Sequence, residues 1–478
     1  MLWWFWKGRI KRTTTWKLVM NIATASELNE FIKRYPAIKM LEVLMPDMNG
    51  IIRCKRIPVA EFEAFYHDGV KGPASTMLLN VRGEFCDEVD FADVEGDPDM
   101  LIHPISNTLS PITWLKSDTA QVLGTFTRLD GTPAWFDSRN VLIKALESLR
   151  AMGLKPVVAT ELEFYLIKAG DNALPEPLLA KVPGTNIEQP GIQYAMAEDL
   201  WDNDAFLEDV RLACESQNVP MATVHSEFSP GQFEINLHHV DDPVIACDHA
   251  VLLKRIVKGV AREHGMSASF MAKPFMEIPG NGLHIHLSLY DDEGINVFSD
   301  PDSMEVPAIS DKLRHAIGGL AETMPDAMAI FAPNANSYRR LIPGNFAPLT
   351  PNWGYNHRDV SLRIPVSGHS DCRVEHRVAG ADANPYLVMA AIIAGVHHGL
   401  SQGFDPGEMI AEGVEIEEEI TLPRIWSLAL DEFDSSALLP QYLGEDYCRL
   451  FGTVRRGECE QFATQISNID YEWYLRAM

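Results

Sequence analysis

Four short segments of this chain place charged or polar side chains on every second residue of otherwise apolar stretches. Side chains alternate between the two faces of a strand, so residues two apart point the same way. A strand inside a mixed α/β core is normally apolar on both faces. Each segment therefore predicts a strand with one polar face. The segments are VVATELEFYLI (157–167), SEFSPGQFEINL (226–237), HIHLSL (284–289) and RVEHR (373–377).

Five glutamates and one histidine on these strands require a shared countercharge. A carboxylate moved from water into a protein interior costs several kcal/mol unless it is paired or binds a cation. If the strands are neighbours, their polar faces meet in one cavity, and a divalent metal is the compact solution. Oxygen-rich ligation with one imidazole favours Mg²⁺ or Mn²⁺ over zinc. The alternative is that each pair lies on a solvated face of an antiparallel sheet. The predicted ligands are Glu161, Glu163, Glu227, Glu234, His284 and Glu375.

Arginines are concentrated in a different part of the chain. Residues 327–358 contain no acidic residue, although the chain has 67 of them. Guanidinium groups bind phosphate and carboxylate through two parallel hydrogen bonds. Arginines beside a metal-lined cavity therefore predict a clamp for anions, above all the phosphates of a nucleotide. Ordinary surface pairing is the alternative, and we adopt it for Arg339. The remaining arginines of this group are Arg340, Arg358, Arg363, Arg373 and Arg377.

Composition excludes several classes of partner. A net charge of −27 leaves no broad basic surface for a nucleic acid backbone. Seven scattered cysteines, an odd number, favour reduced thiols and a cytoplasmic location over a disulfide framework. The chain has no apolar run of about 18 residues, so we expect no membrane-spanning helix.

The chain exceeds the size of one ordinary hydrophobic core, which predicts two domains. We expect residues 1–20 to be a disordered extension or a mis-assigned start with Met20 as the true first residue. Residues 21–132 predict a small domain built largely on strands, and residues 133–478 a larger one. Helical periodicity predicts helices over 136–153, 249–265 and 384–399, each ending at a glycine.

The segment KPFMEIPGNGLHIHLS (273–288) resembles the nucleotide-binding signature of the glutamine synthetase family. ELEF, EFSPGQFE, NSYRRLIPG, RIP and RVEHR also stand in the order of that family's motifs, and the resemblance spans residue 21 to the C-terminus. It implies an α+β fold. A small β-grasp-like N-terminal domain would precede a catalytic domain whose curved antiparallel sheet forms a funnel flanked by helices.

The resemblance also implies residue roles. Two or more Mg²⁺ or Mn²⁺ ions would be bound, the first by Glu163, Glu227 and Glu234 and the second by Glu161, His284 and Glu375. ATP would lie along His286 and Ser288, with its phosphates facing Arg358, Arg363 and Arg373. Glutamate would be held by Arg340, Arg377 and the backbone at Gly280. The implied reaction converts glutamate and ATP to γ-glutamyl phosphate, from which an amine displaces phosphate; Arg340, Arg358 and Arg363 would be catalytic.

Two departures from the family pattern concern the amine. Family members that use ammonium carry a glutamate where this chain has Phe346, and an aspartate in a segment that here reads KGPAS (71–75). An ammonium ion gains little without a carboxylate, whereas an apolar ring can line a channel for an alkyl group. We therefore expect Phe346 to contact a primary amine such as putrescine or another alkylamine or polyamine. Three alternatives stay open: Phe346 as a packing residue with an acid supplied by another loop, a glutamine synthetase that uses ammonia, and an inactive scaffold protein.

The resemblance implies a homododecamer of stacked hexameric rings, with active sites shared between neighbouring subunits. The segment DPDM (97–100) is a candidate for the shared part. The stretch 403–426 contains no tyrosine, which predicts that regulation by adenylylation is absent, and its acidic run GVEIEEEI (413–420) predicts a solvated loop.

Overall fold

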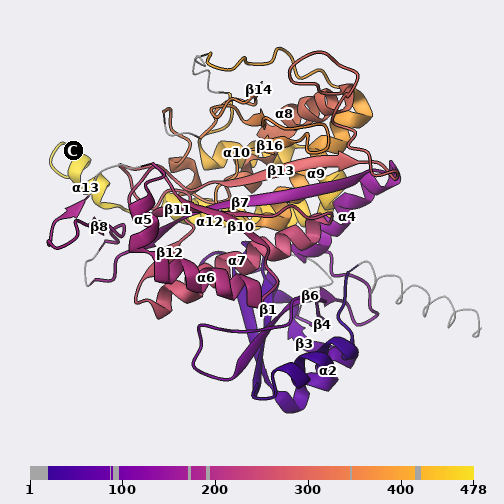
Figure 1. Ribbon diagram of the computed structural model, residues 1–478, viewed down its shortest axis with the longest axis vertical. Helices are drawn as coiled ribbons and strands as arrows, with labels where there is room; N and C mark the ends of the chain where they lie inside the picture. Colours follow the sequence, from indigo (N-terminus) through magenta and orange to yellow (C-terminus); the bar gives the residue numbers. More distant parts are fainter. Residues whose placement is uncertain are drawn as a thin grey trace, which may run out of the picture.

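The computed structural model describes residues 20–86, 88–89, 96–170, 174–189, 194–344, 347–414 and 421–478. Three predictions therefore fall wholly or largely outside the described residues: the extension before Met20, the role of Phe346, and the acidic run, of which only 413 and 414 are described. Two β-sheets organise the chain (Figure 1).

The first sheet is built from the first part of the chain and has six strands in the order β2-β1-β6-β4-β3, with β5 paired to β6. Its central strand β6 is buried along its whole length and runs parallel to β1 but antiparallel to β4. The strands are β1 (Met40–Pro46), β2 (Ile52–Pro58), β3 (Val70–Pro73), β4 (Asp99–Pro104), β5 (Ser110–Pro111) and β6 (Thr119–Thr127). The helices that accompany it are α2 (Ala25–Arg34), α3 (Phe62–Asp68), η1 (Val59–Glu61) and η2 (Ala74–Met77).

The second sheet has eight strands in the order β10-β11-β7-β13-β16-β15-β14, with β12 paired to β7. All pairs are antiparallel except β14 with β15. The strands are β7 (Lys155–Ile167), β10 (Met221–Ser226), β11 (Gln232–Leu237), β12 (Ser267–Ser269), β13 (Leu283–Tyr290), β14 (Trp353–Tyr355), β15 (Leu362–Ile364) and β16 (Val374–His376). A separate hairpin is formed by β8 (Ala180–Lys181) and β9 (Glu188–Gln189).

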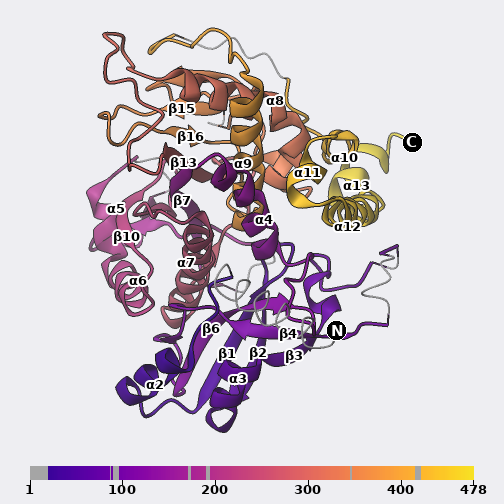
Figure 2. The same cartoon turned by 90° about the vertical axis from the view of Figure 1, so that its right-hand side faces the viewer.

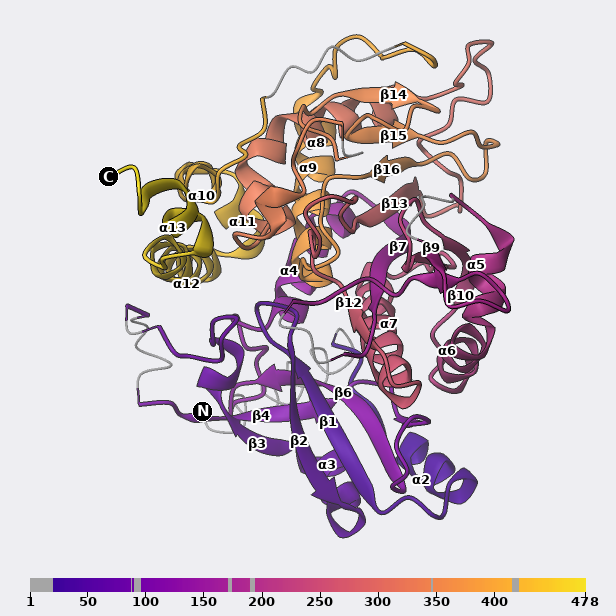
Figure 3. The same cartoon turned by 90° about the vertical axis from the view of Figure 1, so that its left-hand side faces the viewer.

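Helices cover the outer side of this sheet, which curls into an open half-barrel (Figure 3). The helix α7 packs on β7 and lies between the two sheets, while α9 packs against α4, α7 and α8 (Figure 2). Four long helices surround the core: α4 (Ser138–Ala151), α7 (Pro243–Glu263), α8 (Asp311–Phe331) and α9 (Pro385–Gln402). The others are α5 (Ala197–Asp202), α6 (Asp204–Ser216), η3 (Ser337–Arg339), α10 (Trp426–Ser435), α11 (Leu439–Leu443), α12 (Glu445–Ala463) and α13 (Asn468–Tyr474). The predicted α+β fold with a curved, mainly antiparallel sheet is confirmed.

The three predicted helices are present, but two of their boundaries are wrong: α7 begins at Pro243 rather than at residue 249, and α9 does not end at Gly399. The helix predicted over 384–399 continues past Gly399 and ends before Gly403, which has a φ of +69°. Gly399 instead lies at the contact between α9 and α8, where an added Cβ would come within 2.1 Å of the His315 carbonyl oxygen. This glycine permits close helix packing, and the left-handed backbone that ends the helix comes four residues later.

A buried polar network joins the two parts of the chain. Arg139 of α4 forms an ion pair of 2.9 Å with Asp248 of α7 and donates a hydrogen bond of 2.8 Å to the carbonyl oxygen of Met20. The amide of Asn384 donates to the carbonyl oxygen of Asp47 at 3.1 Å. The parts thus form a common interior, and the proposed division at residues 132 and 133 stays a prediction. Within the described residues, no helix is long and apolar enough to cross a membrane.

Candidate active site

Three rows of polar side chains run across the second sheet on one face. In the first row, the pairing places His225 of β10 opposite Glu234 of β11, and Glu234 opposite Glu163 of β7. The second row pairs Glu161 with Asn236 on one side and His284 on the other. The third pairs Glu375 of β16 with His286 and with Arg363. Strand register therefore converts the alternation along each strand into a continuous polar surface.

This surface forms one wall of a cavity of about 720 Å³. Of the residues predicted from the sequence, thirteen line it: Glu161, Glu163, Glu227, Glu234, Gly280, His284, His286, Arg340, Arg358, Arg363, Arg373, Glu375 and Arg377. Ser288 is not among the lining residues, because it is buried and its hydroxyl donates to the Cys372 carbonyl oxygen at 2.9 Å. The structure thus brings together thirteen of the fourteen predicted residues that it describes.

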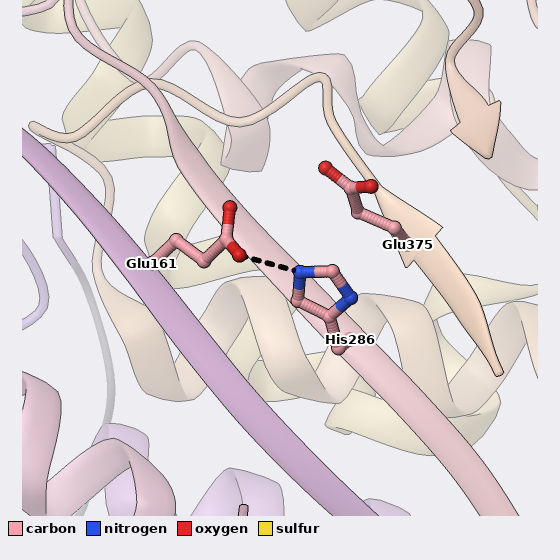
Figure 4. A group of neighbouring side chains, drawn as sticks. All are labelled: Glu161, His286 and Glu375. Carbon is pink, nitrogen blue, oxygen red and sulfur yellow. Dashed lines mark hydrogen bonds and ion pairs between the residues drawn. The ribbon is translucent and has the colours of Figure 1, made fainter. Parts of the chain in front are cut away.

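Two imidazoles converge on Glu161. His286 Nε2 lies 2.9 Å from Glu161 Oε1, and His284 Nδ1 lies 3.3 Å from Oε2. Figure 4 shows Glu161 and His286 pointing toward one another, with Glu375 beside them on the neighbouring strand. Burial alone would raise the pKa of the Glu161 carboxyl, but these imidazoles lower it well below its ordinary value.

The opposite trend holds at Glu234. Its side chain is buried. One group of ligand atoms within 4.8 Å of one another joins it to Glu161, and a second such group joins it to Glu227. Burial raises the pKa of the Glu234 carboxyl well above its ordinary value, and the negative charges of Glu161, Glu163 and Glu227 raise it further. This part of the cavity therefore has more negative charge than the protein neutralises.

At the other side of the cavity, Glu375 is neutralised by arginine. Arg363 Nη1 donates to Glu375 Oε2 at 2.7 Å, and Arg377 Nη1 forms an ion pair with Glu375 Oε1. Burial raises the pKa of this carboxyl, but Arg377, His286 and His284 together lower it to about 2. Glu375 is thus held as a carboxylate between the acidic and the basic parts of the cavity.

The acidic part fits divalent cations. Three groups of side chains each offer ligand atoms within 4.8 Å of one another: Glu161, His286 and Glu375; Glu161, Glu234 and His284; and His225, Glu227 and Glu234. Carboxylate oxygens with a minority of imidazole nitrogens suit Mg²⁺ and Mn²⁺. These groups differ from the predicted sets of three, so the division of ligands between two ions stays a prediction.

Glu163 lies in none of these groups. One of its oxygens accepts a hydrogen bond of 2.7 Å from the backbone N–H of Gly282. Gly282 has no room for a side chain, since an added Cβ would lie 2.8 Å from His284 Nε2 and 2.9 Å from Arg340 Nη2. The glycine therefore brings a carboxylate, an imidazole and a guanidinium to one point of the backbone.

The basic part is lined by arginines with unused donors. Arg340 is buried and donates one hydrogen bond of 2.8 Å to the Val378 carbonyl oxygen. Within the described residues, the buried Nε atoms of Arg363 and Arg377 have no hydrogen-bond partner. Arg358 is exposed, and it forms no ion pair with any described residue. Buried donors that face a cavity are available to an anionic ligand.

Ten lining residues were not predicted, among them His225, Asn236 and Gln232. His225 Nε2 lies 2.8 Å from Glu227 Oε1, which raises the pKa of the imidazole. Asn236 donates to Glu234 Oε1 at 3.0 Å, and Gln232 donates to the Gly280 carbonyl oxygen at 3.0 Å. A signal existed, because all three stand at even spacing from Glu227 or Glu234 in one segment.

The KGPAS stretch contains no acid, but one lies beside it in space. Asp97 accepts hydrogen bonds from the Ser75 backbone N–H at 2.9 Å and from the Ser75 hydroxyl at 2.8 Å. The adjoining strand β4 begins at Asp99, which pairs with Pro73. A carboxylate thus belongs to this part of the first sheet although the local sequence lacks one.

Comparison with known proteins agrees with this geometry. A family profile described as "Glutamine synthetase, catalytic domain" matches residues 136–474. Gamma-glutamylputrescine synthetase PuuA of Escherichia coli (strain K12) is 39% identical over 458 residues, which cover 95% of each chain. Glutamate–isopropylamine ligase of Pseudomonas sp is 29% identical, covering 94% of this chain and 97% of the relative. Glutamine synthetase of Pyrococcus abyssi (strain GE5 / Orsay) is 30% identical, covering 93% and 94%.

Solved structures show the same architecture. The structure titled "Apo GmaS without ligand" superposes with a TM-score of 0.79 at 24% identity, covering 93% of this chain and 99% of that one. At this level of identity the likeness establishes a shared fold.

Proposed function

The chain belongs to the glutamine synthetase family, and we propose that it is an ATP-dependent ligase that joins the γ-carboxylate of glutamate to a primary amine, putrescine or another alkylamine. Membership makes it an enzyme of the ligase class. The 39% identity to a γ-glutamylputrescine synthetase over nearly the whole of both chains is the observation that carries the choice of amine.

The two-part cavity supports the proposed chemistry. Glu161, Glu163, Glu227, Glu234, His284 and Glu375 would hold two or more Mg²⁺ or Mn²⁺ ions. When bound, such ions neutralise charge on the phosphates and on the transferred phosphoryl group. The donors of Arg358, Arg363 and Arg373 would bind the phosphates of ATP, with His286 and Ser288 along the nucleotide. The buried Arg340 and Arg377, with the backbone at Gly280, would bind the carboxylates of glutamate.

In the first step a γ-carboxylate oxygen of glutamate attacks the γ-phosphorus of ATP, and ADP leaves. In the second step the amine nitrogen attacks the γ-carbonyl carbon, phosphate leaves, and the nitrogen loses a proton. Arg340, Arg358 and Arg363 would stabilise the negative charge that develops on the transferred group. The buried arginines beside the curled sheet would hold glutamate and ATP in position for the attack.

The experiment is a comparison of amines. Purified protein is assayed for ADP formation with ATP, Mg²⁺, glutamate and one amine at a time: putrescine, ethanolamine, methylamine, isopropylamine or ammonium. We expect kcat/KM for putrescine to exceed that for ammonium by about tenfold or more, an energy difference of about 1.4 kcal/mol. A higher kcat/KM for ammonium would reject the proposed acceptor, and absence of turnover with every amine would favour the inactive scaffold.

A variant separates the acceptor from the rest of the reaction. Glutamate at position 346 would restore the carboxylate that ammonium-using members carry there, so Phe346→Glu should raise kcat/KM for ammonium and lower it for putrescine. Phe346→Leu is the matched control, because it keeps an apolar side chain and should not improve the use of ammonium. An equal effect of both variants would show that Phe346 does not select the amine.

We also propose that the protein is cytoplasmic and assembles as a homododecamer of two stacked hexameric rings with shared active sites. The match to members of the glutamine synthetase family over nearly the whole chain supports the assembly proposal, because resemblance to that family implies such an assembly.

A further inference from the structure

A second large cavity lies between the first sheet and α7, and it shares no lining residue with the active-site cavity. Its volume is about 880 Å³. We call it the α7 pocket. It is lined by the turn between β1 and β2, by residues 114–116, by one side of α7, by residues 268–271 and by Ala381 and Asp382. Figures 2 and 3 both place α7 between the two sheets, where this pocket opens.

The α7 pocket is basic in a strongly acidic protein. Five cationic residues line it, Lys116, Lys254, Arg255, Lys258 and Arg262, against two acids, Glu263 and Asp382. The whole chain has a net charge of −27. Chance placement would therefore favour an acidic pocket, and the local excess of positive charge calls for a ligand of opposite sign.

Two lysines of α7, Lys254 and Lys258, line the pocket one helical turn apart. Arg255 is bound to Glu42 and donates to Gln121 at 2.8 Å. Within the described residues, neither Lys254 nor Lys258 has a carboxylate at ion-pair distance. Both amines instead lie over one aromatic ring, at 5.8 Å and 5.6 Å from the centre of Phe270.

Burial disfavours the charged form of both amines. Burial lowers the pKa of Lys254 to about 7, and the charge of Lys258 contributes in the same direction. Burial also lowers the pKa of Lys258. An anion between them would favour the charged form of both amines.

We propose that the α7 pocket binds a small dianion, held between Lys254 and Lys258, with the apolar part of the ligand against Phe270 and Trp114. A phosphate ester and a dicarboxylate carry the same charge and fit the same pair of amines. Two ammonium groups one helical turn apart suit two oxygens of one phosphate or the two ends of a short dicarboxylate.

The α7 pocket and the active site share a segment of backbone. Lys254 Nζ donates to the Ala383 carbonyl oxygen at 3.0 Å. Next to it, the Asp382 carboxylate accepts from Asn334 at 2.8 Å and from Ser337 at 2.7 Å, at the start of the turn that carries Arg340. Arg340 in turn donates to Val378 of the same segment. A dianion that draws the Lys254 amine away from Ala383 therefore alters the support of Arg340. This consequence rests on the proposed role of Arg340 in binding glutamate.

Reductive labelling with pyridoxal 5′-phosphate tests the site directly. The reagent is an anion whose aldehyde condenses with an unprotonated amine, releasing water, and borohydride reduces the imine to a stable secondary amine. Full-length protein is labelled at pH 7.5 and the modified lysines are located by peptide mass spectrometry. We expect Lys254 or Lys258 to be labelled about tenfold or more faster than Lys312, an exposed lysine of α8, because an ordinary lysine has a pKa near 10.4.

Protection identifies the ligand. Inorganic phosphate and glutarate are each added at one ionic strength, with chloride as the control. Protection by phosphate alone indicates a phosphate ester, and protection by glutarate alone indicates a dicarboxylate. Protection by both supports the site without separating them. Labelling of both lysines no faster than that of Lys312, or protection no stronger than that given by chloride, would overturn the proposal.

A kinetic experiment tests the link to the active site. The protecting dianion also competes at the active site, so the KM for glutamate is measured with and without it in wild type and in Lys258→Gln. Competition at the active site is common to both proteins. We expect an additional change of KM, about twofold or more, in wild type only, and Lys312→Gln to behave as wild type. Identical responses in all three would reject the link, while the labelling result stands apart from it and from the proposed function.

Discussion

At the scale of single residues, the carboxylates of the active-site cavity differ in how far neighbouring cationic side chains neutralise them. Glu161 is compensated by two imidazoles and Glu375 by two arginines, whereas Glu234 is raised in pKa by burial and by its acidic neighbours. Without bound cations, the Glu234 carboxylate is therefore repelled by its acidic neighbours, and a bound cation would offset this repulsion. Stability and cation binding are therefore coupled at this residue.

Glu234→Gln should expose that coupling. Glutamine removes a charge but can still accept the hydrogen bond from Asn236. Without metal, we expect Tm to rise by about 1 to 3 °C, since each kcal/mol shifts the Tm of a domain by about 2–4 °C. With saturating Mn²⁺ or Mg²⁺, the metal-induced gain in Tm should be smaller than in wild type. Differential scanning fluorimetry with and without metal measures both.

The matched control is Glu322→Gln, which removes one negative charge from α8, outside the cavity. It should change neither the metal-free Tm nor the response to metal. If Glu234→Gln lowers the metal-free Tm, the repulsion argued for the acidic cluster is absent.

His376 makes a separate prediction about acid. Its side chain is buried on the opposite face of β16 against Phe331, with ring centres 4.6 Å apart. Burial, with help from the charge of His284, lowers the pKa of this imidazole from 6.5 to about 3. The folded state therefore keeps His376 neutral while the unfolded state takes up a proton below pH 6.5. Since the unfolded state then binds more protons, stability falls as pH drops below 6.5.

His376→Leu removes this penalty. The Tm difference between wild type and variant should move in favour of the variant by about 1 °C or more from pH 7.5 to pH 5.5. A constant difference for His376→Leu would mean that the fold does not lower the pKa of this imidazole.

The individual site residues were largely predictable, because side-chain alternation in strands is a local property. Glu161, Glu163, His284 and His286 were found from their spacing alone. His225 and Asn236 were missed, although they stand two residues from Glu227 and Glu234, because the strand register that sets them opposite Glu234 and Glu161 depends on contacts distant in sequence. The role of Phe346 lies outside the described residues and rests on the sequence.

At the scale of elements, the contact between α8 and α9 decides how close the helices behind the sheet can pack. Gly319 and Gly399 face one another there. Gly399 has its neighbours so close that an added Cβ would lie 2.1 Å from the His315 carbonyl oxygen and 2.8 Å from the Gly319 backbone. Backbone atoms, unlike the end of a flexible side chain, move only with the whole helix.

Gly399→Ala should therefore separate the two helices. Although alanine favours a helix intrinsically, we expect a net loss of about 1 to 3 kcal/mol, the usual cost of an overpacked core. Thermal or urea unfolding measures it. Gly170→Ala is the control, since an added Cβ meets no atom within 4 Å there. A stability equal to or above that of wild type would show that α8 and α9 adjust without cost.

Helix boundaries were less predictable than the helices themselves. Asp137 caps α4, accepting a hydrogen bond from the Arg139 N–H at 2.9 Å, whereas the start of α7 was misplaced, because it lies at Pro243 rather than at residue 249. The end of α9 was misplaced because Gly399 resembles a terminating glycine in sequence, and only packing against α8 reveals its other purpose. A cap is a local hydrogen bond, whereas close packing involves two helices that are distant in the chain.

At the scale of the whole molecule, the proposed ring assembly gives a purpose to the acid beside KGPAS. Asp97 lies in the loop that leads into β4 of the first sheet, accepts hydrogen bonds from Ser75, and is not among the residues that line the chain's own active-site cavity. In a head-to-tail ring the first sheet of one subunit can reach the cavity of the next. A carboxylate there would bind the distal ammonium group of a diamine.

Asp97→Asn should therefore lower kcat/KM for putrescine by about tenfold or more, the value of a hydrogen bond to a charged group, and have a smaller effect with methylamine. Asparagine also tolerates the positive φ of 52° at this position, so the fold should be retained. A second variant, Glu163→Gln, removes a carboxylate from the active-site cavity itself.

Co-expression of the two variants tests whether active sites are shared. In a mixed ring, a site is intact when its cavity comes from an Asp97→Asn subunit and its neighbour is a Glu163→Gln subunit. Random mixing of equal amounts places this arrangement at about one quarter of the sites, so about one quarter of wild-type putrescine activity should return. If each active site were confined to one chain, the mixed protein would show only the average of the two variants, because no subunit in it would carry both an intact Asp97 and an intact Glu163.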